Sequence, residues 1–462
     1  MNSKISEYFE NLKGKTVSLI GFGVSHRPVA DMFLSRGVSV VVHDKKTPEQ
    51  MADILKEYEG KDIKFVLGEN YLDGVSGDVV FRTPGMRPDN KVYVDAKNRG
   101  SRITSEMEEF FRLCPCKIAA VTGSDGKTTS TTLICKMLEK AGYTCHIGGN
   151  IGKPLLPEIE KIKENDFAVI ELSSFQLSSF IPSPDIAVVT NVAPNHLDWH
   201  TGMDEYIEAK EHIFINQRPD ARLVLNYNND ITRSFAKKAK ANVCFFSLTD
   251  KVGNGTYLAE NGDIIHSENG KEETVMNRSL IRIPGDHNVD NYMTAISAVW
   301  GLCPVEKIRD VAEHFGGVEH RMEFVREYNG VSYYNDSIGT SPTRSIACLK
   351  SQTEPIVMIA GGYDKKIPYE PLAPYLAEKV KVLILMGKTA PKIKEALLNC
   401  DKYSPEKTKI VEVETMEDAV KAAVENSKKG DRVYLSPASA SFDLYPNFEA
   451  RGKHFKNIVN SL

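Results

Sequence analysis

The chain has 462 residues, of which 41% are hydrophobic and 26% charged, a globular composition that excludes disordered and fibrous proteins. Lysine and arginine number 58 against 62 acidic residues, which gives a formal net charge of −4. That balance provides no global basic field for nucleic acid or an anionic membrane, and the length suggests about three domains.

The compartment follows from three further features of the sequence. No apolar run is long enough to cross a bilayer, and the N-terminal segment is too charged for a secretory signal. The eight cysteines have neither a disulfide-framework spacing nor a zinc spacing. We therefore expect a cytoplasmic protein with reduced thiols and no membrane insertion.

Short apolar runs rich in β-branched residues alternate with helical stretches along the whole chain, which predicts βαβ units and largely parallel sheets. Most runs are apolar throughout, as expected for strands covered on both faces. The predicted strands are Thr16–Ile20, Ser39–His43, Asp78–Phe81, Ile118–Thr122, Phe167–Glu171, Ile186–Asn191, Arg222–Leu225, Pro355–Ala360, Val380–Met386 and Arg432–Ser436. Thr256–Thr274 contains two Asn-Gly pairs and predicts an antiparallel hairpin inserted among them.

Two breaks divide this pattern. The first lies at Leu113-Cys114-Pro115, just before a strand begins again. The second lies at Gly316-Gly317, after a predicted helix that ends near Phe315. We therefore predict three α/β domains, with boundaries at residues 1–113, 114–317 and 318–462.

The first predicted strand leads into a glycine turn, Gly21-Phe22-Gly23-Val24-Ser25-His26. It begins like a dinucleotide fingerprint, but His26 stands where the third glycine is expected. Asp44 ends the next strand, where an acid would meet a ribose, and Thr83-Pro84-Gly85 follows another strand at the ligand crevice. The pattern favours a domain that binds one nucleotide, and a βα turn without a ligand is the alternative.

The strongest local signal is the segment Ile118–Thr129, IAAVTGSDGKTT. A strand, a glycine-rich turn and a helix follow one another, so backbone N–H groups and the helix N-terminus can face phosphates. Lys127 would reach the β- and γ-phosphates, and the Thr128 hydroxyl would meet Mg²⁺. The spacing is two residues shorter than the usual Walker form. The competing interpretation is a tight glycine turn with a surface lysine.

Candidate acids and bases follow the later strands. Glu171 ends an apolar strand and suits Mg²⁺ or a structural ion pair. Asn191–His200 carries His196, Asp198 and His200, which fit metal ligation, acid–base chemistry or turn capping, and for a lone histidine capping or packing is the usual role. Lys210 lies on a predicted helix, Asp204–Ile215, and by itself reads as an exposed helix lysine.

The order of these motifs resembles that of the Mur ligases, ATP-dependent amide ligases of peptidoglycan precursor synthesis, and the resemblance covers all three predicted domains. In the third domain the motifs look like those of the D-glutamate-adding members. The motifs that carry the resemblance are Thr122–Thr129, Glu171–Ser174, Asn191–Asp198, Lys210, Gly285–Asn288 with Asn291, His320–Phe324, Asn335–Ser337, Gly361-Gly362, Leu435–Asp443 and Asn447–Gly452.

The resemblance implies a Rossmann-like UDP-binding domain, a central ATPase domain of the P-loop type and a Rossmann-like third domain. It implies catalytic roles for Lys127, Glu171, His196 and Lys210, with Lys210 carbamylated and Mg²⁺ held by Thr128, Glu171, His196 and Lys210. The implied ATP contacts are Gly123, Ser124, Asp125, Gly126, Lys127, Thr128, Thr129, Asn288, Asn291, Arg321 and Asp336. The implied UDP-substrate contacts are Gly23, Val24, Ser25, Asp44, Lys45, Thr83, Gly85, Asn150 and Ser173. The implied D-glutamate contacts are Thr340, Lys365, Ser441, Phe442 and Phe448.

The implied reaction joins D-glutamate to UDP-N-acetylmuramoyl-L-alanine through an acyl phosphate, with ATP as co-substrate, by an enzyme that we expect to be a monomer. Four positions depart from the family pattern. Ile338 replaces a common lysine, and Ser441-Phe442 replaces a familiar Ser-Leu pair. Arg82 is an unusual neighbour of Thr83-Pro84-Gly85, and Lys366 could stand in for Lys365.

Three other interpretations compete with this one. A different Mur ligase or a folate polyglutamate ligase is the nearest, and the Gly21–Gly23 turn and the Ser436–Phe448 signature argue against the folate enzyme. A nucleotide-binding oxidoreductase is weakened by the missing third glycine. A non-catalytic ATP-binding switch protein would leave Glu171, His196 and Lys210 as coincidences.

Overall fold

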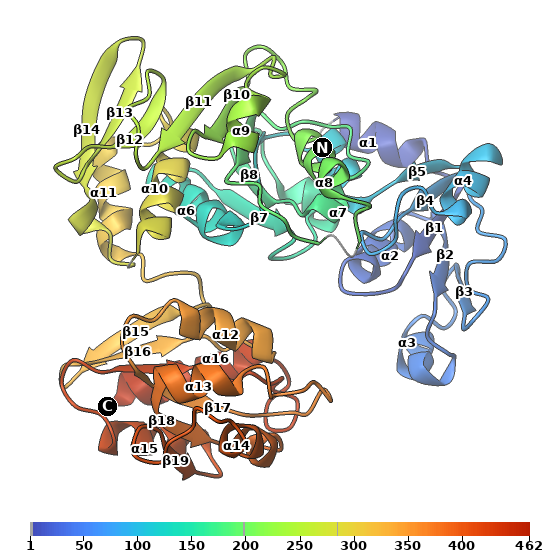
Figure 1. The fold of residues 1–462 in the computed structure, drawn as a ribbon. Coiled ribbons are helices and arrows are strands. Elements are labelled where there is room, and N and C mark those ends of the chain that lie inside the picture. Colours follow the sequence, from blue (N-terminus) through green and yellow to red (C-terminus); the bar gives the residue numbers. More distant parts are fainter. Residues whose placement is uncertain (1–2, 197–198, 284) are drawn as a thin grey trace. The chain divides into compact units, whose positions relative to one another are not determined.

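The computed structural model describes residues 3–196, 199–283 and 285–462 (Figure 1). They form two compact units, Met1–His314 and Phe315–Leu462, and the strands of the described residues make three sheets. Two of the sheets belong to the first unit and one to the second. Each unit is described on its own below.

The first sheet of unit one is parallel throughout, in the order β3-β2-β1-β4-β5. Its strands are β1 (Thr16–Ile20), β2 (Ser39–Asp44), β3 (Ile63–Leu67), β4 (Val79–Phe81) and β5 (Arg102–Thr104). The helices of this part are α1 (Ser3–Glu10), α2 (His26–Leu34), α3 (Ala52–Glu57), α4 (Lys91–Asn98) and α5 (Glu106–Leu113), with a 3₁₀ turn at Glu49–Met51. β1 and β4 are buried almost throughout, as expected for strands covered by helices.

The second sheet of unit one runs in the order β14-β13-β12-β11-β10-β9-β6-β8-β7, and all pairs from β12 to β7 are parallel. Its strands are β6 (Lys117–Thr122), β7 (Cys145–Gly149), β8 (Phe167–Glu171), β9 (Ile186–Val189), β10 (Arg222–Asn226), β11 (Asn242–Ser247), β12 (Gly255–Leu258), β13 (Asp263–Glu268) and β14 (Lys271–Asn277). Its helices are α6 (Lys127–Lys140), α7 (Ser174–Leu177), α8 (Met203–Glu211), α9 (Asp230–Phe235), α10 (Asp286–Val299) and α11 (Val305–His314), with 3₁₀ turns at Leu156–Lys161 and Arg278–Leu280.

Unit two holds the third sheet, in the order β15-β16-β20-β17-β18-β19. Only the pair β15–β16 is antiparallel among its described strands. The strands are β15 (Glu323–Tyr328), β16 (Val331–Asn335), β17 (Ile356–Ala360), β18 (Val380–Leu385), β19 (Lys409–Glu412) and β20 (Arg432–Leu435). The helices are α12 (Pro342–Lys350), α13 (Ala373–Lys379), α14 (Ala390–Leu398), α15 (Met416–Glu425) and α16 (Phe448–Ser461). Two apolar clusters, one centred on Met358 and one on Ile359, occupy opposite sides of β17.

The predicted α/β class with mostly parallel sheets is confirmed, and each predicted strand is present within one or two residues of its expected ends. The predicted hairpin is part of a larger antiparallel insert, because β12, β13 and β14 pair in turn and extend the second sheet. Asn269 and Gly270 both have positive φ, as the β13–β14 turn requires. The boundaries of the three predicted domains stay a prediction.

The carboxyl ends of the parallel strands set the position of the candidate sites. The glycine turn follows β1, and the Thr83-Pro84-Gly85 turn follows β4. The loop of residues 123–126, which we call the phosphate loop, follows β6. Glu171 is the last residue of β8, which lies next to β6 in the sheet. Ligands of open α/β sheets bind at such edges.

Candidate functional site

The loop between β6 and α6 is shaped by two glycines. Gly123 and Gly126 have φ angles of +149° and +76°. A Cβ on Gly123 would lie 1.9 Å from Thr190 Oγ1, and one on Gly126 would lie 2.5 Å from Asn291 Oδ1. The loop therefore needs glycine at both positions for backbone conformation and for space.

Residues after β9 brace this loop. The Asn191 side-chain oxygen accepts hydrogen bonds from the amides of Ser124 (3.1 Å) and Asp125 (2.9 Å). Thr190 Oγ1 donates to the Asp125 carbonyl at 2.6 Å. Ser124 Oγ lies 2.9 Å from the Tyr206 hydroxyl on α8 and donates to the Ala193 carbonyl. Contacts between protein groups thus hold the loop in one shape, which is the kind of preorganisation that favours binding of a charged group.

Lys127 is the first residue of α6, and its ammonium curls back over the loop. Lys127 Nζ donates to the carbonyls of Gly123 (3.0 Å) and Ser124 (2.9 Å). Thr128 and Thr129 follow in the first helical turn and are half-buried. The N–H groups of a first turn have no partner within their own helix, so this end of α6 offers donors, a cation and a hydroxyl together.

Two of the implied ATP contacts, Asn288 and Asn291, lie on α10, behind the same loop. Asn291 is buried, and its side-chain oxygen accepts from Ser130 Oγ at 3.2 Å. Its side-chain nitrogen donates to the Asn288 side-chain oxygen at 3.3 Å. Asn291 therefore packs α10 against α6, a supporting contact that motif spacing did not reveal, while half-buried Asn288 lies nearer the surface.

Glu171 is 1% exposed at the end of β8. Its Oε1 accepts from the Asn150 side-chain amide at 2.8 Å. Its Oε2 is buried and has no hydrogen-bond partner among the described residues. A buried carboxylate oxygen without a donor is costly unless a cation or a proton donor arrives. Glu171 therefore fits a divalent cation better than a structural ion pair, and Asn150 orients it.

Lys210 is not the exposed helix lysine that its local sequence indicates. Its side chain is 1% exposed, its Nζ donates to the Gly123 carbonyl at 2.9 Å, and it lies 4.5 Å from the centroid of the Tyr206 ring. Burial, with the nearby charge of Lys127, lowers the pKa of Lys210 well below its ordinary value. The local interpretation was wrong because α8 turns this face toward the phosphate loop.

His196 and His200 differ in environment. His196 is exposed, has a φ of +54°, and lies edge-on to the Phe175 ring with centroids 4.8 Å apart. His200 is buried, and its Nε2 is 3.0 Å from Ser174 Oγ. Asp198 lies outside the described residues. Within the described residues, no three His, Cys, Asp or Glu side chains gather as a ready metal site.

Two buried side chains, Asp44 and His26, lie within hydrogen-bond distance of the backbone of the glycine turn after β1. The Asp44 carboxylate accepts from the amides of Phe22 (2.7 Å) and Lys46 (2.9 Å). His26, at the position of the missing third glycine, is buried with Nδ1 2.9 Å from the Gly21 carbonyl oxygen. Asp44 thus braces the turn with both oxygens rather than presenting a free carboxylate. The other predicted contacts here, Gly23, Val24, Ser25 and Lys45, are exposed.

The remaining predicted UDP-substrate residues lie on nearby turns. Thr83 is half-buried and Gly85 exposed after β4. Ser173 caps α7 by accepting from the Gln176 amide, and the Gln176 side chain accepts from the Ser173 amide in return. A hollow is lined by Val24, Ser25, His26, Arg82, Pro84, Ser105, Glu106, Met107, Gly149, Gly152, Pro154 and Gln176. It therefore joins the glycine turn to the loops after β4, β7 and β8.

In unit two, Asp336 is a buried carboxylate after β16. Its Oδ2 accepts from Ser436 Oγ at 2.8 Å, and its Oδ1 accepts from the Met322 amide at 3.3 Å. Burial raises the pKa of Asp336 to about 6. The Arg321 amide donates to the Val318 carbonyl in a tight turn. Ile338, the departure from the family pattern, donates its amide to the His320 carbonyl at 3.1 Å.

The predicted D-glutamate residues fall into smaller contact groups within unit two. Lys365 Nζ lies 3.5 Å from the Thr340 carbonyl oxygen, whereas the Lys366 amide is held by Asp364. Phe442 is 62% exposed and packs edge-on against Tyr363. Ser441 is buried, and Phe448 lies edge-on to His320 with centroids 5.9 Å apart. The Lys365 ammonium therefore lies beside Thr340.

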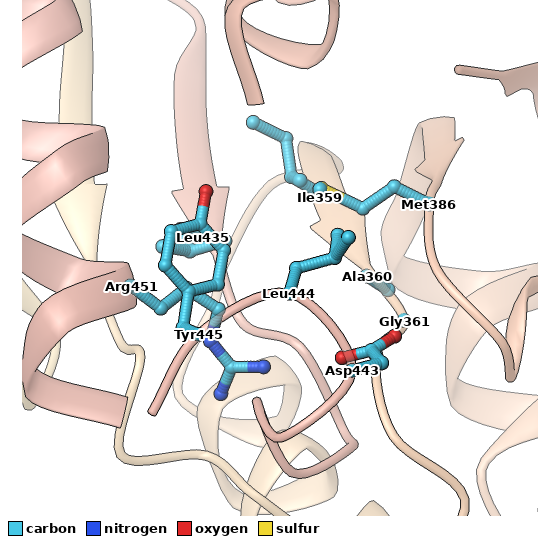
Figure 2. Close-up of a pocket in the computed structure, with 10 residues that line it drawn as sticks. Ile359, Ala360, Gly361, Met386, Leu435, Asp443, Leu444, Tyr445 and Arg451 are labelled. Carbon is cyan, nitrogen blue, oxygen red and sulfur yellow. The ribbon is translucent and has the colours of Figure 1, made fainter. Parts of the chain in front are cut away.

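Arg451, on α16, was not among the predicted site residues. It is 3% exposed and lines a small hollow with Asp443 and Tyr445 (Figure 2). Its guanidinium donates to both oxygens of Ser337 and to the carbonyls of Ser439 and Ala440, at 2.9–3.1 Å. Arg451 therefore ties the loop after β16 to the loop after β20. The Asn447–Gly452 motif contained this residue, but nothing in its spacing showed the role.

Among the described residues, no helix has both the length and the apolar character needed to cross a membrane. Two family models match the chain. The Mur ligase middle domain matches residues 121–299, and the Mur ligase, glutamate ligase domain matches residues 320–439. Together they cover the phosphate loop, Glu171, Lys210 and most of unit two.

Relatives that align over the full length of the chain also point to the Mur ligases. The chain is 50% identical over 466 residues to the UDP-N-acetylmuramoylalanine--D-glutamate ligase of Acetivibrio thermocellus, and 48% identical over 463 residues to that of Clostridium botulinum strain Hall. Each alignment covers 100% of both chains. Among solved structures, the MurC ligase of Thermotoga maritima matches with a TM-score of 0.54 at 20% identity, covering 97% of this chain and 99% of that one. MurF of Acinetobacter baumannii matches with a TM-score of 0.55 at 15% identity, covering 98% and 92%. These two likenesses concern the fold alone.

Proposed function

The chain belongs to the Mur ligase family, and from that premise we propose that it joins D-glutamate to UDP-N-acetylmuramoyl-L-alanine with ATP as co-substrate. The observation that carries the proposal is the full-length identity with ligases named for that reaction. The preformed phosphate loop supports the ATP-dependent part, because it combines a helix N-terminus, two obligatory glycines and Lys127.

The reaction needs an activated carboxyl group. The alanyl carboxylate attacks the γ-phosphorus of ATP, the bond to the bridging oxygen breaks, and ADP leaves with that electron pair. The D-glutamate amine then attacks the acyl phosphate carbon, loses a proton, and expels inorganic phosphate as the amide forms. Lys127 and the first-turn N–H groups of α6 would neutralise charge on the transferred phosphoryl group, and the position of Lys127 Nζ over the loop supports this role.

We propose that Mg²⁺ binds at the carboxyl end of β8. The buried Glu171 Oε2 lacks a partner among the described residues, and Asn150 holds the other oxygen, so one carboxylate oxygen would remain to hold such a cation. Thr128, His196 and a carbamylated Lys210 would complete the ligands. A bound divalent cation supplies charge neutralisation and orientation of phosphate oxygens. The buried Lys210 amine supports carbamylation, because CO₂ reacts with a neutral amine.

The remaining contacts are proposed on the same basis. Gly23, Val24 and Ser25, with the turn after β4, would hold the UDP moiety. Thr340, Lys365 and the Ser441-Phe442 segment would hold D-glutamate, and Arg321 and Asp336 the nucleotide. We expect a monomer in the cytoplasm, where ATP is available. Light scattering coupled to size-exclusion chromatography measures the molar mass in solution and so tests whether the protein is a monomer.

The test is a phosphate-release assay with ATP, Mg²⁺, UDP-N-acetylmuramoyl-L-alanine and a panel of amino acids. Release that requires both the UDP substrate and D-glutamate is the expected result. Strong release with L-lysine, meso-diaminopimelate or L-alanine instead would contradict the substrate assignment. Lys127→Ala is the matched variant, and it should keep the circular dichroism spectrum of the wild type while losing phosphate release.

A further inference from the structure

Two cysteines that have no part in the candidate site lie side by side where α5 ends and β6 begins. The Sγ atoms of Cys114 and Cys116 are 3.5 Å apart. Cys114 is the C-cap residue of α5, and Cys116 directly precedes β6. The pair therefore lies on the segment where the sequence predicts the boundary between the first two domains.

The backbone between the two thiols is already restricted. Pro115 stands between them, and a proline fixes its own φ and holds the residue before it in an extended conformation. The ψ angle of Cys114 is 124°, within that extended range, and its amide donates to the Phe110 carbonyl at 2.8 Å. An S–S bond is about 2.0 Å long, so the sulfurs need to approach by only about 1.5 Å. Joining them therefore costs little chain entropy.

The two thiols differ in exposure and in acidity. Cys114 is partly exposed, whereas Cys116 is 8% exposed and belongs to the apolar core of unit one. The hydrogen bond between the thiols lowers the pKa of Cys114, against the effect of burial, and together with burial it raises the pKa of Cys116. Because the thiolate is the nucleophile, a reagent from solvent reacts first with Cys114, and Cys116 waits behind it.

The surroundings of the pair leave thiol chemistry as its use. Within the described residues, no group of three or more Cys, His, Asp or Glu side chains forms around it, so it is not part of a ready metal site. A disulfide between residues this close in sequence closes a short, strained ring, and strained disulfides are the more easily reduced ones. The pair should therefore be reduced at rest and should return to that state after oxidation.

We propose that Cys114 and Cys116 form a reversible dithiol–disulfide site that is oxidised by low-molecular-weight disulfides, with Cys114 as the nucleophile and Cys116 as the resolving thiol. The Cys114 thiolate attacks one sulfur of the small disulfide, whose S–S bond breaks, and one small thiolate leaves with the electron pair and takes up a proton. Cys116 then loses its proton and attacks Cys114 Sγ, which releases the second small thiol. Two protein thiols are oxidised, and one small disulfide is reduced to two thiols.

The second step gives the site its purpose. Without Cys116, oxidised Cys114 would remain a mixed disulfide or, with stronger oxidants, pass to acids that thiols cannot reduce. With Cys116 at 3.5 Å, oxidation ends at an internal disulfide that cellular thiols can open again. The pair would thus protect the segment between α5 and β6 from lasting modification.

The experiment incubates the full chain with oxidised glutathione, blocks the remaining thiols with iodoacetamide and maps the peptides by mass spectrometry. In wild type we expect a peptide with both cysteines that has lost two hydrogen atoms and carries no glutathione, and dithiothreitol should restore both thiols. Cys116→Ser should carry at least about 10-fold more glutathione on Cys114 than wild type, because nothing resolves the adduct. Cys400 is the matched control, since it is also partly exposed but has no second cysteine beside it in sequence, and it should form only the mixed disulfide.

Incubation continues until Cys400 has reacted. If Cys114 and Cys116 are both still free at that time in wild type, the proposal is wrong. A lasting glutathione adduct on Cys114 in wild type, or a bond from either residue to a different cysteine, would also overturn it. Cys116→Ala removes the same thiol without burying a hydroxyl and is judged by the same criterion if Cys116→Ser does not fold. None of these outcomes depends on the proposed ligase reaction.

Discussion

Arg87 Nη1 donates a hydrogen bond to the Trp199 carbonyl at 2.9 Å, although the two residues are 112 positions apart. The same guanidinium pairs with Glu205 on α8 at 3.0 Å, and the Trp199 indole N–H donates to the Gly85 carbonyl at 3.4 Å. The turn after β4 is therefore connected to α8, the helix whose Tyr206 and Lys210 contact the phosphate loop.

Arg87→Ala should loosen this connection between α8 and the turn after β4, which we propose binds the UDP substrate. We expect the KM for the UDP substrate to rise roughly tenfold, equivalent to losing a hydrogen bond to a charged group, with a smaller change in the KM for ATP. Steady-state kinetics measures both constants. Arg27→Ala is the control, because Arg27 forms an exposed pair with Glu57 away from α8. Equal effects of the two substitutions would show that the connection has no functional weight.

Gly126→Ala tests the shape of the phosphate loop. The new Cβ meets Asn291 Oδ1 at 2.5 Å and takes a positive φ, so we expect at least a tenfold rise in the KM for ATP. Gly142→Ala has a φ of +100° but open space around the new Cβ. It should cost about 1 kcal/mol in stability, the backbone penalty alone, and leave the KM for ATP unchanged. A normal KM in Gly126→Ala would contradict the packing argument.

Glu106 predicts a pH dependence of stability. Its pKa is raised to about 7 by burial, so the folded state keeps the proton while the unfolded state loses it near pH 4.5. Stability from this group is complete below about pH 4.5 and is lost as pH rises to about 7, by about 3 kcal/mol at most. Glu106→Gln keeps an oxygen for the Leu155 and Leu156 amides, so urea unfolding of this variant should vary less between pH 5 and 7.5.

Glu109→Gln, on the same helix, should act in the opposite direction. Although burial raises the pKa of Glu109, hydrogen bonds from Arg102 and its charge hold that pKa below the ordinary value. This group stabilises the fold above the pKa of the unfolded chain and loses that effect as pH falls. Glu109→Gln should therefore lower stability most at neutral pH. Parallel pH profiles for the two variants would refute both assignments.

Lys210→Ala tests the carbamate. We expect activity to fall by at least 100-fold, because an anion at the proposed Mg²⁺ site is lost, while binding of an ATP analogue to the Lys127 loop changes little. Acetate or another short carboxylate should restore part of the activity. The control is Lys237→Ala, which changes an exposed lysine just after α9 and should behave as wild type. Full activity in Lys210→Ala would end the proposed metal role.

Sequence patterns predicted the parallel strands well, because strands buried on both faces are apolar throughout. They missed the edge strands β3, β5, β7 and β19, which are short or carry polar residues, and they also missed the interior strand β11. β15 and β16 were missed for another reason, since their Tyr, Arg and Glu side chains alternate with apolar ones around a turn at Asn329-Gly330. The local pattern of apolar residues indicates how deeply a strand is buried. Strands at sheet edges are less buried, so this pattern is weaker in them.

The residues of the candidate site could be predicted only where they are contiguous in sequence, so that their spacing fixes their geometry. The phosphate loop is contiguous, so its glycines, Lys127 and helix could be identified from spacing. Lys210 and Arg451 could not, because their burial depends on segments distant in sequence. Asp44 has a further role that its position did not show, since both of its oxygens accept from backbone amides of the turns around it, while its contact with a ligand stays a prediction.

The bracing of the phosphate loop also has a consequence for biogenesis. Thr190, Asn191, Tyr206 and Asn291 all contact a loop that is complete at residue 126. A growing polypeptide therefore carries the whole loop sequence long before it carries the residues that give the loop its shape. Competence to bind ATP should emerge late, once α10 has left the ribosome, so stalled shorter chains would neither bind nor consume nucleotide.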